Sequence, residues 1–225
     1  MGFKVQHGEG YHTYWKEPGI VGYPLQFTFR QPQLDRLPVI DWAYPERVSM
    51  KGHPAHGFKR DVVHSFSLEV PLAAVDVFVV DLDVAWMACA ENCFPQNQRF
   101  RIEVPIGSKA KRSKNFEQLQ VRPVPNLQGW KASARLLGEW YEVALEPSNE
   151  EAPELESIYL FSEDGQLTSS FEQHVQQHAD GKIIVRARAS GIVDPAERLP
   201  CLLYAEKGLG EKKFVRISPQ LKVMD

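Results

Sequence analysis

Cysteine is scarce in this 225-residue sequence, which holds only Cys89, Cys93 and Cys201. Apolar runs are short, and none approaches the roughly 20 residues that span a bilayer, so direct insertion into a membrane is not expected. Neither sign of charge dominates, because 26 Lys and Arg oppose 29 Asp and Glu for a formal net charge of -3. Such a balance gives no field that would favour nucleic acid or an anionic membrane surface.

Common catalytic and cofactor-binding motifs are also missing. The sequence contains no G-x-S-x-G element, no glycine-rich phosphate loop and no paired carboxylates in a convincing context. We therefore expect no bound cofactor. No signal peptide precedes the strand-like residues 3–5, so the chain is expected either to be cytosolic or to have lost a leader.

Short alternating segments dominate the first half of the chain. Residues 25–29, 62–70 and 100–104 alternate between apolar and polar side chains, and residues 75–84 are apolar and β-branched. These segments end near Pro or Gly and show little helical periodicity. The pattern predicts an all-β antiparallel sandwich over residues 1–107, with turns about every 8–12 residues.

A different composition begins after residue 107. Residues 108–122 are predicted to form a linker, in which 109–120 could make a short amphipathic helix with Phe116 and Leu119 on its inner face. Strand-like sequence returns at 134–145, 157–161, 182–188, 202–205 and 214–217. We therefore predict a second, smaller β-sandwich domain over residues 123–225.

Cys89 and Cys93 enclose the segment Ala90-Glu91-Asn92. An extended chain would hold their Cα atoms roughly 13 Å apart, whereas a disulfide needs about 5.5–6 Å. A bond between them therefore requires the chain to turn back, and Asn92 tolerates the left-handed conformation that such a turn uses. Strand-like sequence on both sides places the pair at the tip of a hairpin, where a partner could reach it.

Such a disulfide would be a weak structural crosslink. Closing a loop of about five residues removes only about 2 kcal/mol of unfolded-chain entropy, against nearly 5 kcal/mol for a loop of about 100 residues. A close, exposed pair suits thiol–disulfide exchange, and an inert hairpin disulfide is the alternative. Cys201 lies in an apolar stretch and is predicted to be a buried free thiol.

A metal site is a second alternative for the same cysteines. Zinc prefers four ligands in tetrahedral geometry, and His53 and His56 could complete a set with Cys89 and Cys93. The thioethers of Met50 and Met87 would shift such a site toward copper(I). The protein would then be a copper- or zinc-binding periplasmic protein.

Four segments, in this order and spacing, resemble the N-terminal periplasmic domain of the DsbD thiol–disulfide interchange family over about residues 3–107. Residues 10–19 read G-Y-H-T-Y-W-K-E-P-G and are followed by Gly22 and Pro24, and residues 42–47 read W-A-Y-P-E-R. Gly57-Phe58 then leads into the strand at 62–70. The fourth segment, W-M-A-C-A-E-N-C-F-P at 86–95, is similar to the redox segment of that family.

The resemblance implies an immunoglobulin-like fold, a periplasmic or otherwise exported location, and a role in electron transfer and cytochrome c biogenesis. Its implied partners are thioredoxin-like redox proteins and a transmembrane electron donor. By the same resemblance, Cys93 forms the mixed disulfide with a partner and Cys89 resolves it. The segment 50–58 is implied to be a cap loop over the pair, with His53, Pro54, His56 and Phe58 as its candidate residues.

The sequence has no membrane segment and no C-x-x-C thioredoxin-like motif. The resemblance therefore implies a stand-alone or excised component of a protein-disulfide reductase, with its partners supplied in trans. A non-catalytic interaction module is the other function class. In that case the disulfide is inert, and the aromatic strand at 11–15 or the second domain binds a protein.

Overall fold

A computed structural model describes residues 1–30, 37–70, 76–107, 124–148, 155–207 and 213–224. Within these residues the chain forms strands β1 to β17 and no helix, which confirms the predicted all-β class; accordingly, no described helix is long and apolar enough to cross a membrane. The helix expected at 109–120 and the linker at 108–122 lie outside the described residues. The chain divides into two compact units: Met1–Pro18, Gly22–Gly52 and Gly57–Pro123 form the first, and Gly19–Val21, His53–His56 and Val124–Asp225 form the second.

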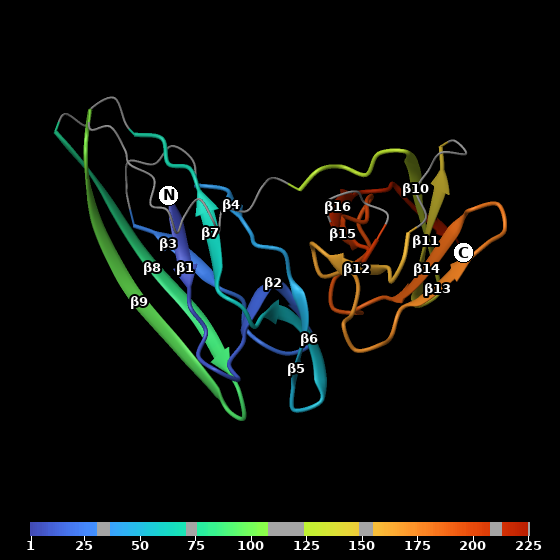
Figure 1. Cartoon of the computed structure of the whole chain (residues 1–225), viewed down its shortest axis with the longest axis horizontal. Helices are drawn as coiled ribbons and strands as arrows, with labels where there is room; N and C mark the ends of the chain where they lie inside the picture. The colour runs from blue at the N-terminus through green and yellow to red at the C-terminus, as the bar shows by residue number, and fades with distance from the viewer. Residues whose placement is uncertain (31–36, 71–75, 108–123, 149–154, 208–212, 225) are drawn as a thin grey trace. The chain divides into compact units, whose positions relative to one another are not determined.

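The first unit contains short strands and one long hairpin, drawn in green in Figure 1. Its sheets have the orders β1-β7-β4, β2-β6-β5 and β3-β8-β9. The pairings within the first and third of these sheets are antiparallel. The strands are β1 (Gly2–Val5), β2 (Thr13–Gly19), β3 (Gln26–Phe29), β4 (Ile40–Asp41), β5 (Glu46–Met50), β6 (His53–Phe58), β7 (Val62–Phe66), β8 (Val77–Cys89) and β9 (Cys93–Pro105). Of these residues, Gly19 of β2 and His53–His56 of β6 are assigned to the second unit.

Aromatic rings join two sheets of the first unit. Phe3 on β1 meets Phe27 on β3 and Phe100 on β9 edge to face, with ring centroids 5.6 Å and 5.5 Å apart. Phe29 meets Phe66 on β7 in the same way at 5.3 Å. Such pairs add about 0.5–1.5 kcal/mol each beyond the area that they bury. The first unit is thus a packed, immunoglobulin-like sandwich, as predicted.

The segment 50–58 was predicted as a loop, and this prediction is wrong. Residues 46–50 and 53–58 form β5 and β6, which pair as a hairpin. Lys51 and Gly52 form the two-residue turn between them with φ angles of 49° and 84°. Two consecutive positive φ angles define the type I′ turn, whose twist matches that of paired strands.

The second unit is built from a five-stranded and a three-stranded sheet. Their orders are β13-β14-β11-β10-β17 and β12-β15-β16, and the β10–β17 pair is parallel. The strands are β10 (Trp130–Leu137), β11 (Trp140–Pro147), β12 (Tyr159–Ser162), β13 (His174–Gln177), β14 (Ile183–Arg188), β15 (Cys201–Tyr204), β16 (Phe214–Ile217) and β17 (Leu221–Met224).

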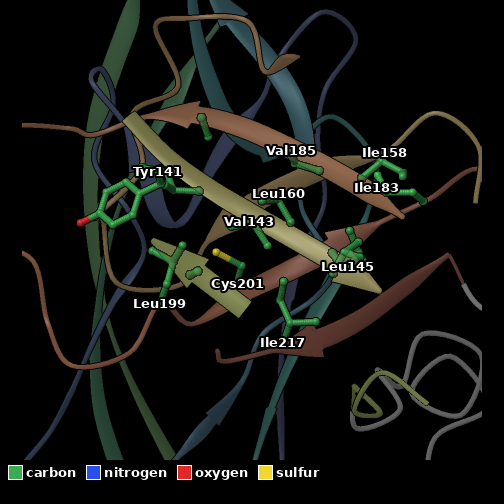
Figure 2. Close-up of a cluster of buried hydrophobic side chains, with 14 of the residues drawn as sticks. Tyr141, Val143, Leu145, Ile158, Leu160, Ile183, Val185, Leu199, Cys201 and Ile217 are labelled. Atoms are coloured by element: carbon green, nitrogen blue, oxygen red, sulfur yellow. The ribbon is translucent and has the colours of Figure 1, made fainter. Parts of the chain in front are cut away.

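One apolar core lies between these two sheets. Val143 and Val185 of the larger sheet pack in the same cluster as Leu160, Cys201 and Ile217 of the smaller one (Figure 2). Alternate residues of β11 and β14 point into this core, as the period of two in a strand requires. The second unit is therefore a β sandwich of its own.

Residues 134–145 were predicted as one alternating strand, but they belong to a hairpin. β10 ends at Leu137 and β11 begins at Trp140. Gly138 has a φ of 59°, the conformation that glycine supplies at the first position of a type II′ turn. The turn was missed because alternation continues through it.

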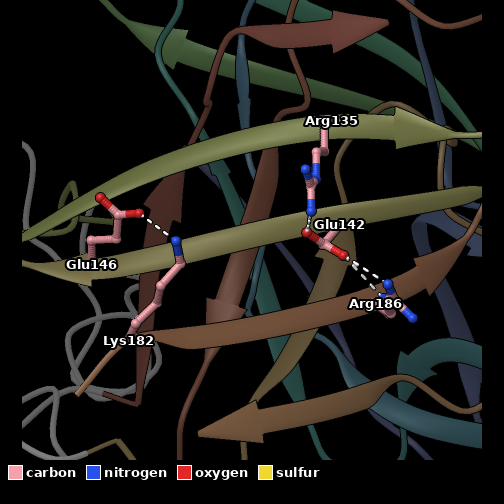
Figure 3. Close-up of polar contacts among 5 residues, drawn as sticks. All are labelled: Arg135, Glu142, Glu146, Lys182 and Arg186. Atoms are coloured by element: carbon pink, nitrogen blue, oxygen red, sulfur yellow. Dashed lines mark hydrogen bonds and ion pairs between the residues drawn. The ribbon is translucent and has the colours of Figure 1, made fainter. Parts of the chain in front are cut away.

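The other face of the larger sheet carries charged side chains (Figure 3). Glu142 on β11 lies opposite Arg135 on β10 and Arg186 on β14. Arg135 Nε donates to one carboxylate oxygen at 2.8 Å, and Arg186 Nε donates to the other at 3.1 Å. Glu142 is itself only 5% exposed, so its desolvated charge is held between two arginines.

Candidate functional site

The cysteine pair closes the long hairpin of the first unit. β8 and β9 pair without interruption from Val77 opposite Pro105 to Cys89 opposite Cys93. The two cysteines are joined by a disulfide, with Cα atoms 4.2 Å apart. Three residues form the connecting loop, in which Ala90 N donates to the Asn92 carbonyl at 3.1 Å.

Cys89 has a neighbour on each side within this part of the fold. On the side away from Cys93, His12 N donates to the Cys89 carbonyl and Cys89 N donates to the His12 carbonyl, both at 2.9 Å. The backbone N–H and C=O of a strand residue point to the same side in an antiparallel sheet. Cys89 therefore makes its backbone bonds with His12, and its pair with Cys93 is of the closer, non-hydrogen-bonded kind, about 4.5 Å between Cα atoms.

This pairing also fixes which side chains share a face. Residues directly opposite each other on neighbouring strands project to the same side of the sheet. His12, Cys89 and Cys93 therefore form one cross-strand row. Since strand side chains alternate, the row lies on the opposite face of β8 from Leu82 and Val84, which belong to the aromatic core.

The two cysteines of the row differ in their exposure. Cys89 is fully buried, whereas Cys93 is half-buried. Glu91, Asn92 and Phe94 around Cys93 are exposed. A molecule that approaches this end of the hairpin therefore meets Cys93 first.

His12 is buried beside Cys89 and has a polar partner. It is 4% exposed, and its Nε2 lies 3.3 Å from the hydroxyl of Tyr14, which is fully buried. Burial lowers the pKa of His12, and the positive charges of Lys59 and His7 lower it further. The imidazole is therefore neutral at neutral pH.

The candidate cap residues lie in different surroundings. His53–His56 belong to the second unit, where His56 Nε2 lies 2.9 Å from the Tyr159 hydroxyl. Phe58 is fully buried in the first unit, and its ring packs 5.3 Å from that of His64. The cap role of His53, Pro54, His56 and Phe58 stays a prediction.

The metal alternative finds no support in the structure. Among the residues that the structure describes, no group of three or more His, Cys, Asp or Glu side chains could hold a metal ion. The sulfurs of Cys89 and Cys93 are bonded to each other. Cys201 is the free cysteine and is buried in the core of the second unit.

Sequence reasoning missed His12 as part of the site. In the sequence, His12 appeared only within the aromatic strand at 11–15 and the motif at 10–19, and the structure buries Thr13, Tyr14 and Trp15 of that segment. No local signal pairs His12 with Cys89, because the two residues are 77 positions apart and meet through one isolated bridge.

Comparison with known proteins agrees with this geometry. Residues 1–105 match the family model described as thiol:disulfide interchange protein DsbD, N-terminal. The crystal structure of the N-terminal periplasmic domain of ScsB from Proteus mirabilis has a TM-score of 0.70 at 14% identity, over 97% of this chain and 86% of that chain, and so shares the fold. No curated protein sequence matches the chain. The resemblance noted in the sequence is thus confirmed for residues 1–105, which match the model of the DsbD N-terminal family.

Proposed function

We propose that the first unit is a thiol–disulfide exchange module that carries two electrons on Cys89 and Cys93. The observation that carries this proposal is the unequal exposure of the two bonded cysteines at the end of the hairpin. An exchange site needs one sulfur within reach of an incoming thiolate and a second that can leave and return. The family match of residues 1–105 supports the same assignment.

The exposures also suggest the order of events. A donor thiolate attacks the half-buried Cys93, forms a mixed disulfide with it and releases Cys89 as a thiolate. A second donor thiol then attacks the mixed disulfide, so the donor leaves oxidised and the module holds two thiols. When the module reduces an acceptor, Cys93 attacks the acceptor's disulfide and Cys89 resolves the resulting bond.

Thioredoxin-like proteins are the proposed partners, with a transmembrane electron donor as the ultimate source of electrons. Two exposed rings support docking beside Cys93. Phe94 is 45% exposed and Tyr11 is 38% exposed, with ring centroids 6.4 Å apart. Exposed aromatic side chains of this kind are common at the centres of protein interfaces. We also propose a periplasmic or otherwise exported location, where such partners and stable disulfides occur.

A trapping experiment tests the assignment of the two sulfurs. The reduced Cys89→Ala variant is mixed with an oxidised thioredoxin-like protein, and disulfide-linked complexes are resolved by non-reducing electrophoresis and mass spectrometry. We expect a complex through Cys93, because no resolving thiol remains. The matched Cys93→Ala variant should give little complex, since Cys89 is buried. Equal trapping by both variants would contradict the assigned roles.

Measurement of the reduction potential separates exchange from an inert crosslink. The wild-type chain is equilibrated with glutathione buffers and the fraction of reduced Cys89/Cys93 is quantified by alkylation. Structural disulfides of exported proteins have potentials below about −300 mV, and exchange-active ones lie higher. A potential below that limit, together with no trapped complex, would leave a non-catalytic interaction module as the function.

A further inference from the structure

We propose that His12 carries the Cys89 proton during exchange, as acceptor when Cys89 attacks and as donor when Cys89 leaves. This inference deepens the proposed function and rests on it. Thiol–disulfide exchange at Cys89 and Cys93 does not by itself require a histidine. The inference therefore gives the buried His12 a chemical role of its own.

Geometry places the imidazole next to the sulfur that needs it. His12 and Cys89 are opposite residues joined by two backbone hydrogen bonds of 2.9 Å. In such a pair the Cα atoms are about 5.5 Å apart and the side chains project to the same side. The proposed transfer requires the two side chains to rotate until an imidazole nitrogen of His12 reaches the Cys89 Sγ.

Burial explains why Cys89 needs a neighbouring base. A thiolate in apolar surroundings is disfavoured by the loss of its hydration, so a fully buried thiol does not ionise readily without help. Bulk water cannot supply that help to a residue with no exposed surface. The half-buried Cys93 can exchange its proton with solvent, whereas Cys89 requires a group inside the fold.

The surroundings of His12 keep it ready to accept a proton. The titratable groups that act on it are the Tyr14 hydroxyl two residues along the chain, the ammonium of Lys59 and the imidazole of His7. Burial, and after it the positive charge of Lys59, favour the neutral ring, whose unprotonated nitrogen is the acceptor. In the tautomer in which Nε2–H donates to Tyr14, the lone pair is on Nδ1 and Tyr14 fixes the ring orientation.

The proposed step balances in protons and electrons. After Cys93 has formed a mixed disulfide with an acceptor protein, the Cys89 thiol transfers its proton to His12, and its sulfur electron pair forms the bond to Cys93 Sγ. The bond between Cys93 and the acceptor breaks, and the acceptor leaves as a thiolate. The imidazolium then returns the proton to that thiolate through solvent, which leaves an oxidised module and a reduced acceptor. In the reverse direction the donor thiol loses its proton as it attacks Cys93, His12 takes up that proton through solvent, and the imidazolium passes it to Cys89 as Cys89 leaves.

Alkylation of Cys89 as a function of pH tests the proposal. The full chain carrying Cys93→Ala is treated with iodoacetamide, and modified Cys89 is quantified by peptide mass mapping in the presence and absence of His12→Gln. Glutamine can bond to Tyr14 but cannot accept a proton. We expect His12→Gln to slow alkylation at pH 7 by about tenfold, the effect of a one-unit change in thiol pKa. The matched control His178→Gln, at an exposed site of the second unit, should leave the rate unchanged. Equal rates with and without His12 in a folded variant would overturn the proposal.

A second measurement needs no substitution at His12. The ring signals of His12 are titrated by NMR in the oxidised and the reduced wild-type chain. If His12 and the Cys89 thiol share a proton, their titrations are coupled. Reduction of the disulfide should therefore shift the midpoint of the His12 titration. An unchanged midpoint would overturn the proposal even if the glutamine variant failed to fold. If the wild-type chain exchanges with no thioredoxin-like protein, the proposed function fails, and these two titrations still decide whether His12 and Cys89 share a proton.

Discussion

The carbonyl oxygen of Thr13 lies where a side chain at Gly57 would begin: a Cβ at position 57 would be 2.1 Å from it. This contact joins β6 to β2, the strand that follows His12. Because the obstacle is backbone, it cannot rotate away. We expect Gly57→Ala to lower the free energy of unfolding by at least about 2 kcal/mol, measured by urea denaturation.

The control for this prediction is Gly8→Ala. The nearest atom to a Cβ at Gly8 is a Tyr11 ring carbon at 3.5 Å, which is an ordinary contact. We expect a change within about 0.5 kcal/mol. A Gly57→Ala variant as stable as this control would show that β2 and β6 can separate without cost.

His64 makes the first unit sensitive to acid. It is fully buried, and neither ring nitrogen has a hydrogen-bond partner among the described residues. Burial lowers its pKa from 6.5 to about 3, with a smaller effect from His7. In the unfolded chain His64 therefore binds a proton below about pH 6.5, whereas in the folded chain it binds one only below about pH 3. Stability should fall as the pH is lowered through this window, by about 2 kcal/mol at pH 5.

Urea denaturation of wild type and His64→Phe at pH 8, 6.5 and 5 checks this prediction. Phenylalanine fits the neighbouring rings of Phe27, Trp42 and Phe58 and carries no proton. The difference between the two proteins should grow toward pH 5 in favour of phenylalanine. A difference that does not depend on pH would mean that His64 takes up its proton over the same pH range in the folded and the unfolded chain.

Glu142 stabilises the larger sheet of the second unit through its two arginines. Burial raises its pKa, but hydrogen bonds from Arg135 and Arg186 lower it by more, so the carboxyl titrates below its ordinary value of 4.5. We expect Glu142→Gln to cost about 1–2 kcal/mol at pH 7, a modest loss because both arginines are half exposed.

The sign of the pH dependence follows from the lowered pKa. The ion pair contributes stability above pH 4.5, and this contribution is lost as the pH falls through the folded-state pKa, so wild type and Glu142→Gln should converge in acid. Glu146→Gln is the matched control, since Glu146 pairs with Lys182 on the same face but is itself 49% exposed (Figure 3). Its loss should stay below about 0.5 kcal/mol. An equal loss from both variants would argue against a special role for the buried carboxylate.

Thiol counting distinguishes the three cysteines. Burial raises the pKa of the Cys201 thiol well above its ordinary value, so this thiol should not react with a thiol reagent in the folded protein. We expect no reactive thiol in the oxidised folded chain, one after unfolding, and three after reduction and unfolding. Rapid modification of Cys201 in the folded chain would show that the second core opens.

Much of the fold could be predicted because strand alternation is a local signal. The strand at Phe214–Ile217 was predicted with its observed bounds, and the turn of the chain between Cys89 and Cys93 followed from the reach of a disulfide. The hairpins at Lys51–Gly52 and at Gly138 were missed, although both carry glycine turn chemistry. Apolar and polar side chains continue to alternate across each turn. The alternation alone therefore does not reveal where the chain reverses.

The surroundings of the cysteine pair could not be predicted, because they depend on pairing between distant segments. The burial of Cys89 does not follow from its own strand, since its side chain lies on the face opposite to Leu82 and Val84. Likewise, only the bridge to Cys89 gives His12 a place in the site. Such a contact depends on register, which the hydrophobic pattern of a single strand does not specify.

The unbroken ladder between β8 and β9 constrains how this domain can change over evolution. Inserting one amino acid into either strand would turn one cysteine to the other side of the ribbon and prevent the crosslink. Inserting two amino acids into β8 alone would return the Cys89 side chain to its original face, but Cys89 would no longer lie opposite His12. Relatives should therefore vary in length between strands rather than within this ribbon. The residue at position 12 remains free to change, and such a change would alter how readily Cys89 gains and loses its proton.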